Sequence, residues 1–89
     1  MGVSMVDYQA IRARQRVEDN VYTIVDLDCD RQGYCDMSDD ALADEVWAED
    51  PAYVKEAVVN LSRQGQIIVE IKGGGRKIWT DSKWMEEHL

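Results

Sequence analysis

The chain is short of several residue types, and each shortage excludes a class of protein. Two cysteines and a single histidine are too few for a disulfide framework or a four-ligand zinc site, so we expect neither metal nor cofactor. No apolar run approaches the roughly 20 residues that span a bilayer, and the N-terminus has no basic-then-apolar signal pattern. We therefore expect a cytoplasmic protein without a membrane partner.

Basic residues are also scarce, because ten Lys and Arg stand against eighteen Asp and Glu, which gives a net charge of −8. This balance argues against the simplest picture of a nucleic-acid binder. The charge is unevenly distributed, however. Residues 1–50 carry four basic and thirteen acidic side chains, a net of −9, whereas residues 51–79 carry five basic and two acidic ones, a net of +3. An acidic half is thus followed by a locally basic segment.

The best-marked element is a helix over residues 50–65. Asp50 can cap its first N–H groups, Pro51 suits the first helical position, and Gly65 can adopt the left-handed conformation that ends a helix. Apolar residues recur at spacings of three and four, which predicts one buried face: Val54, Ala57, Val58 and Leu61. The other face presents Tyr53, Lys55, Glu56, Asn60, Arg63 and Gln64.

Two helices are predicted before this one. Apolar periodicity predicts the first over residues 7–27, and residues 27–36 then read as a polar loop containing a very short strand around Cys35. Ser38 is predicted to cap the second helix, with acidic residues in its first turn. Its inner face is predicted to comprise Leu42, Ala43, Val46 and Trp47.

After Gly65 the pattern changes to that of strands. Residues 66–72 and 76–80 flank three glycines and predict a β-hairpin with a flexible tip, bordered by Lys72, Arg76 and Lys77. Asp81 is predicted to cap a short last helix that packs on the core through Trp84 and Met85. With 89 residues, no internal repeats and no low-complexity segments, we expect one domain over residues 1–89, with its core over about residues 7–80.

This order of elements, and several residues within it, resemble a known family. The chain is similar to the helix-turn-helix domains of phage and plasmid replication initiators and replisome organisers. In that family a Gly-aromatic-Cys stretch precedes a capping Ser and a Leu-Ala pair. At the end of its third helix a Leu, two or three polar residues, Gly, one further residue and Ile lead into the wing. The matching residues are Gly33, Tyr34, Cys35, Ser38, Leu42, Ala43, Leu61, Gly65 and Ile67.

The resemblance implies an α+β winged helix-turn-helix fold and non-enzymatic binding of double-stranded DNA, in replication or transcription control of phage, plasmid or microbial type. The third helix would enter the major groove, and the hairpin, or wing, would lie on the adjacent backbone. Dimerisation or fusion to a larger initiator is expected, because one domain makes a modest footprint. The residues predicted to contact DNA are Tyr53, Lys55, Asn60, Arg63, Lys72, Arg76 and Lys77.

An alternative function belongs to a different class. Winged helices also serve as protein-interaction modules, and some small acidic proteins bind proteins by imitating the charge of DNA. A pI of about 4.4 favours this reading. So does the start of the third helix, where the family usually has Arg, Lys, Ser or Thr and this chain has Pro51, Ala52 and Tyr53. Two carboxylates, Glu49 and Asp50, stand just before them. Carboxylates at that position would face phosphates at a cost.

Other motifs have simpler readings. Asp26, Asp28 and Asp30 alternate as at the start of a calcium loop, but Arg31 stands where that loop needs Gly, which favours solvated loop carboxylates. Cys35 is expected in the core. The tryptophans are expected to be mostly buried, with an exposed Trp47 as the alternative, an anchor for a partner protein. We find no catalytic set of residues, and we expect neither enzyme activity nor a small-molecule substrate.

Overall fold

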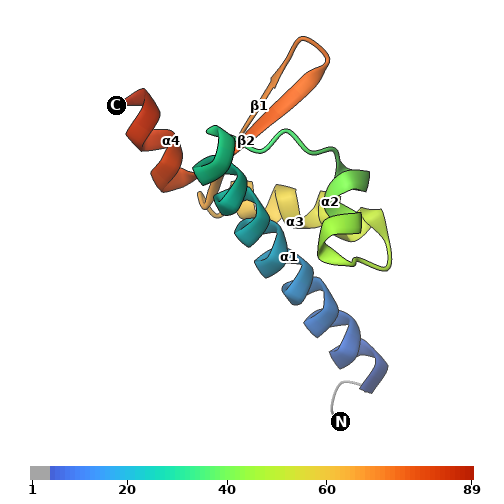
Figure 1. Cartoon of the computed structure of the whole chain (residues 1–89). Coiled ribbons are helices and arrows are strands. Elements are labelled where there is room, and N and C mark those ends of the chain that lie inside the picture. The colour runs from blue at the N-terminus through green and yellow to red at the C-terminus, as the bar shows by residue number, and fades with distance from the viewer. Residues whose placement is uncertain (1–4) are drawn as a thin grey trace.

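A computed structural model describes residues 5–89 of the chain, with side chains from residue 11 onward. Three helices are followed by a two-stranded hairpin and a short final helix (Figure 1). The elements are α1 (Met5–Gln32), α2 (Asp39–Val46), α3 (Pro51–Arg63), β1 (Ile67–Lys72), β2 (Gly75–Thr80) and α4 (Asp81–His88). This order confirms the α+β class and gives a winged-helix-like arrangement.

The helix α1 is longer than expected, and the predicted polar loop from residue 27 is wrong. Asp28 and Cys29 keep their side chains against the core, with 5% and 8% exposure, so the buried face continues for another turn. The Arg31 guanidinium lies 2.8 Å from the Asp28 carboxylate, an i,i+3 pair that supports this last turn. Because Asp26, Asp28 and Asp30 lie on a helix, they do not form a calcium loop.

The helix α2 is a short helix of eight residues between α1 and α3. Ser38 caps it as predicted, its hydroxyl accepting a hydrogen bond from the Ala41 N–H at 3.1 Å. The inner face buries Leu42, Ala43 and Val46, but Trp47 is 91% exposed, so the expectation that it lies in the core is wrong. Trp47 ends α2 in the left-handed region (φ 58°, ψ 39°), which costs a non-glycine residue about 1 kcal/mol.

The helix α3 has the boundaries and the buried face that its sequence predicts. The Asp50 carboxylate accepts a hydrogen bond from the Ala52 N–H at 2.9 Å, Pro51 is the first helical residue, and Gly65 follows the helix with φ 75°. Val54, Ala57, Val58 and Leu61 are all buried. Since α3 packs against both α1 and α2, these four side chains join the three helices into one core.

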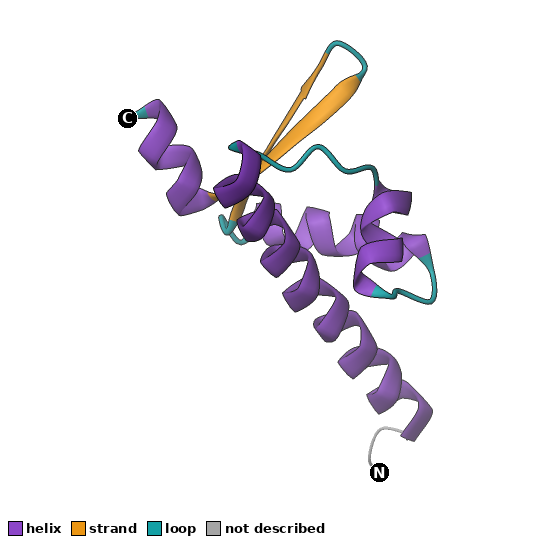
Figure 2. Ribbon diagram, viewed as in Figure 1, coloured by secondary structure: helices purple, strands orange, loops and turns teal. Residues whose placement is uncertain are grey.

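The strands β1 and β2 form an antiparallel wing that extends beyond the helices (Figure 2). At its base Ile67 pairs with Thr80, and at its tip Lys72 pairs with Gly75 across Gly73 and Gly74, both of which have positive φ. Ile67, Ile78 and Thr80 share the face that closes the core, because alternate residues of a strand point the same way. The short strand predicted around Cys35 is a single bridge to Ile78.

The helix α4 covers the other face of the wing base. Trp79 is buried there, with the His88 ring edge-on to it at 5.6 Å, and Trp84 stacks on the same imidazole at 4.4 Å. Trp84 packs on the core as expected, whereas Met85 is exposed. The prediction that Asp81 caps α4 is wrong, because the cap position is Thr80. None of the helices within residues 5–89 combines the length and the apolar character that a membrane span requires.

Candidate nucleic-acid interface

The candidate interface begins with the face of α3 that points away from the core. Residues of a helix are offset by about 100°, so the outward stripe is made by Ala52, Glu56, Val59 and Arg63. Lys55 and Ser62 flank this stripe on the side of the wing, and Tyr53 and Asn60 flank it on the side of α1. The stripe therefore combines one cation and one carboxylate with two apolar side chains.

A cleft of about 330 Å³ separates α3 from the wing, and we call it the wing cleft. Apolar side chains from both elements line it, including Val59 on α3 and Ile71, which is 80% exposed near the tip of the wing. Lys55, Arg63 and Arg76 surround this apolar surface with positive charge, and Asp39 is the single carboxylate. The complete lining comprises Asp39, Lys55, Val58, Val59, Ser62, Arg63, Val69, Ile71 and Arg76.

Arg76 has a structural role in this cleft. Its guanidinium lies 2.7 Å from the Asp39 carboxylate and donates two hydrogen bonds, of 3.1 and 3.2 Å, to the Met37 carbonyl. These contacts join the wing to the start of α2, and both side chains of the ion pair are mostly buried. Arg76 therefore positions the wing and neutralises the single carboxylate of the cleft.

The cations beside Arg76 are available to a ligand. Lys55, Arg63 and Lys72 form no ion pair with any residue that the structure describes, although the chain is rich in carboxylates. Glu56, their neighbour on α3, pairs instead with Arg14 of α1 at 3.8 Å. The positive charge at the wing cleft is thus not cancelled locally, despite the net charge of −8.

Two of the predicted DNA contacts lie on the far edge of α3. Tyr53 is half-buried against α1, and the Arg14 guanidinium lies over its ring at 5.4 Å. Asn60, seven residues later, is on the same edge and is also partly buried. The structure therefore brings Lys55, Arg63 and Arg76 together around the wing cleft and places Tyr53 and Asn60 outside it.

The remaining predicted contacts, Lys72 and Lys77, share one face of the wing. Side chains alternate along a strand, so Lys77 points away from the face that carries Arg76. Its ammonium group lies 4.5 Å from the centre of the Tyr34 ring, and its cross-strand partner is Glu70. Lys72 belongs to the same face but pairs with Gly75 at the tip, where it is exposed.

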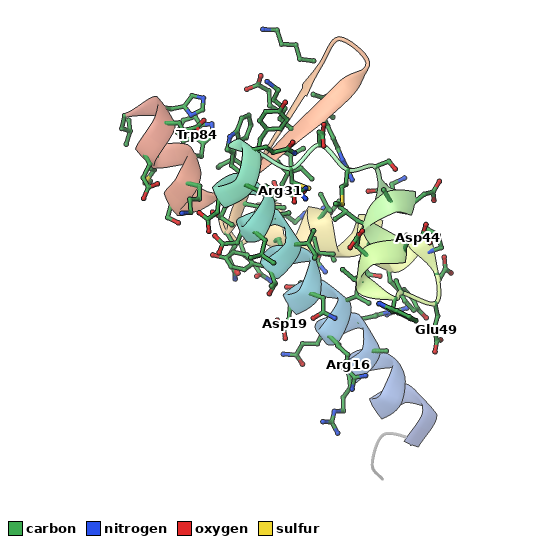
Figure 3. All side chains as sticks on the ribbon, in the orientation of Figure 1. Arg16, Asp19, Arg31, Asp44, Glu49 and Trp84 are labelled. Carbon is green, nitrogen blue, oxygen red and sulfur yellow. The ribbon has the colours of Figure 1, made fainter. Side chains whose placement is uncertain are left out.

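A second surface lies at the other end of α3, and the sequence predicts only part of it. We call it the acidic turn: Asp44, Glu45, Trp47, Glu49 and Asp50. All five side chains are exposed, and Figure 3 shows Asp44 and Glu49 around the connection from α2 to α3. Among these carboxylates, Asp50 caps α3 by accepting a hydrogen bond from the Ala52 N–H. The sequence shows the charges, but the exposure of the indole follows from the backbone conformation at Trp47.

The thiols do not offer a nucleophile. Burial raises the pKa of Cys35 to about 11, and it also raises the pKa of Cys29 above its ordinary value. Nearby carboxylates act in the same direction, Asp28 on Cys35 and Asp26 on Cys29. Both side chains are therefore neutral core groups at physiological pH, as predicted for Cys35.

Comparison with known proteins does not extend this description. The chain matches no protein-family model, no curated protein and no solved structure. The winged-helix-like arrangement thus stands on the order and packing of its own elements.

Proposed function

We propose that the chain is a non-enzymatic DNA-binding winged helix that acts in replication or transcription control. The observation that carries this proposal is a set of unpaired cations: Lys55 and Arg63 line the wing cleft, and Lys72 is exposed at the tip of the wing, on the face opposite the cleft. Contacts from Lys and Arg to phosphates supply most of the affinity of a DNA-binding protein. Lys55 and Arg63 can contact phosphates from α3, and Lys72 can do so from the tip of the wing.

The proposed contact lies mainly on the C-terminal half of α3. The outward stripe of this helix would enter the major groove, with Lys55 and Arg63 on phosphates and Lys72 extending the contact along the wing. Tyr53 and Asn60 would face the duplex from the opposite edge of α3. The acidic turn at the N-terminal end repels phosphates, so the helix would be tilted with that end away from the backbone.

The proposal is tested by fluorescence anisotropy with a labelled random-sequence duplex, first at low and then at physiological salt. We expect Lys55→Ala with Arg63→Ala to weaken binding about tenfold or more and to reduce the log–log salt slope by about 2, because each phosphate contact contributes about one unit. A control with the same charge change is Arg16→Ala with Lys83→Ala, on α1 and α4. Absence of binding by the unchanged protein at low salt would refute the proposal.

A second candidate function, binding of another protein, is favoured by Trp47. Tryptophan is strongly enriched among the residues that dominate protein interfaces, and this indole is almost fully exposed. The acidic turn could therefore serve as an interaction site while the wing cleft contacts DNA. The two functions use different surfaces of one domain.

A further inference from the structure

Trp47 is unusual in both backbone and side chain. It is the single non-glycine residue with positive φ among those that the structure describes, and its side chain is 91% exposed. Glycine suits this position after a helix, because it has no Cβ to clash. Because the indole is not buried in its own core, its apolar surface is free to contact another molecule.

The surroundings of Trp47 define the charge of that molecule. Asp44, Glu45 and Glu49 are exposed next to the indole, and none of them pairs with a basic residue in the described part of the chain. The complementary surface must therefore have an apolar recess for the ring and cations around it.

The wing cleft has both properties. Val59, Val69 and Ile71 supply apolar surface, and Lys55 and Arg63 supply unpaired positive charge at its border. Its volume of about 330 Å³ is at the lower end of the range for small-molecule sites, which is sufficient for one indole ring. The same chain thus carries an acidic aromatic protrusion and a cationic apolar recess.

The two surfaces cannot meet within one molecule. Asp39, at the start of α2, lines the wing cleft, and Trp47 ends the same helix, whose eight residues span about 12 Å. We propose that the acidic turn of one copy docks into the wing cleft of a second copy, with Trp47 as the anchor. The contact is head-to-tail, because different patches meet, and it leaves a free turn and a free cleft at the ends of each assembly.

One consequence rests on the proposed function. Because the acidic turn and DNA would occupy the same cleft, a copy whose cleft holds the acidic turn of another copy would not bind DNA through that cleft, and self-association would therefore compete with DNA binding. Self-association itself does not depend on DNA binding, so the two ideas can fail separately.

The test uses sedimentation velocity of the full chain over a range of concentrations. The unchanged protein should associate, less strongly at high salt, whereas Trp47→Ala and Ile71→Asp should each be monomeric. A mixture of the two variants should form a 1:1 dimer, since Trp47→Ala keeps an intact cleft and Ile71→Asp keeps an intact turn. Ile71 lies exposed at the wing tip, and a far-UV circular dichroism spectrum identical to that of the unchanged chain confirms that each variant is folded.

Three results would overturn the inference. One is an unchanged chain that stays monomeric at every concentration. If a Lys-rich peptide then quenches Trp47 fluorescence, the partner of the acidic turn is a different, basic protein. Another is a mixture that stays monomeric. The third is association of Ile71→Asp alone that still requires Trp47, which would indicate contact between two acidic turns. Trp47→Ala should bind the duplex with the same affinity as the unchanged chain in its monomeric form. Its anisotropy titration therefore tests DNA binding separately from self-association.

Discussion

The two ends of α3 have opposite character although they belong to one helix of thirteen residues. The C-terminal half faces the wing with unpaired Lys55 and Arg63, and the N-terminal end follows a turn of exposed carboxylates around Trp47. Net charge alone would predict that this domain binds only basic partners. The difference between the ends shows that a chain of net charge −8 can present a cationic surface and an acidic one side by side.

Ion pairing produces much of this difference. Arg14 holds Glu56 toward α1, and Arg76 holds Asp39 at the side of the wing cleft. Each pair neutralises a carboxylate that would otherwise oppose Lys55 and Arg63. At the acidic turn there is no equivalent, because no basic residue of the described chain forms an ion pair with Asp44, Glu45 or Glu49.

The largest effect is expected from Arg76→Met. This change leaves Asp39 without its partner and the Met37 carbonyl without two donors, so we expect a loss of about 2 kcal/mol in the free energy of unfolding. It should also weaken DNA binding, because the wing is no longer held beside α3 and the negative charge of Asp39 in the cleft is no longer balanced by a cation. Urea denaturation followed by circular dichroism measures the first effect, and anisotropy the second.

Lys83→Met is the control for this prediction, because it breaks a different ion pair, that with Asp30, without touching the cleft. We expect it to leave both the urea midpoint and the DNA affinity close to those of the unchanged chain. If Arg76→Met behaved like Lys83→Met in both measurements, the cleft would not depend on the ion pair between the wing and α2.

An effect of intermediate size is expected at the acidic turn. Trp47→Gly should raise the free energy of unfolding by about 1 kcal/mol, because glycine adopts the left-handed conformation without steric cost. Trp47→Ala retains that cost and should give no comparable gain. A urea midpoint for Trp47→Gly equal to or below that of Trp47→Ala would mean that the left-handed conformation carries no steric cost. A midpoint for Trp47→Ala well below that of the unchanged chain would mean that the indole stabilises its own fold, which removes the reason to assign it a partner.

The smallest effect separates the two lysines of the wing. Lys72→Ala should weaken duplex binding by roughly twofold to fourfold, as expected for one phosphate contact at the wing tip. Lys77→Ala should have a smaller effect, because its ammonium group lies over the Tyr34 ring on the face opposite Arg76. Anisotropy titrations at low salt provide the comparison, and a larger loss for Lys77 would place DNA on the other face of the wing.

The sequence predicts α3 and the tip of the wing well, because their signals are local. Asp50, Pro51 and Gly65 mark the ends of α3 through their own backbone and capping preferences. Three consecutive glycines between β-branched runs likewise indicate the hairpin. Such features depend on residues only a few positions apart and therefore do not require knowledge of the fold.

Other features depend on contacts between distant segments. Asp28 and Cys29 look like loop residues, but α1 continues through them because the wing base covers this face of the helix. The pairing of Arg76 with Asp39 has no local signal and turns a predicted DNA contact into a structural residue. Trp47 was expected in the core because of its size, yet the left-handed end of α2 directs it outward.

We propose that the wing cleft, and not the acidic turn, contacts DNA. Backbone amide chemical shifts of the ¹⁵N-labelled chain, recorded during titration with a random-sequence duplex at low salt, test this proposal. We predict the largest shifts at Lys55, Val59, Arg63, Ile71 and Lys72, with residues 44–50 nearly unchanged. Shifts concentrated in residues 44–50, or no shifts at saturating duplex, would contradict the account.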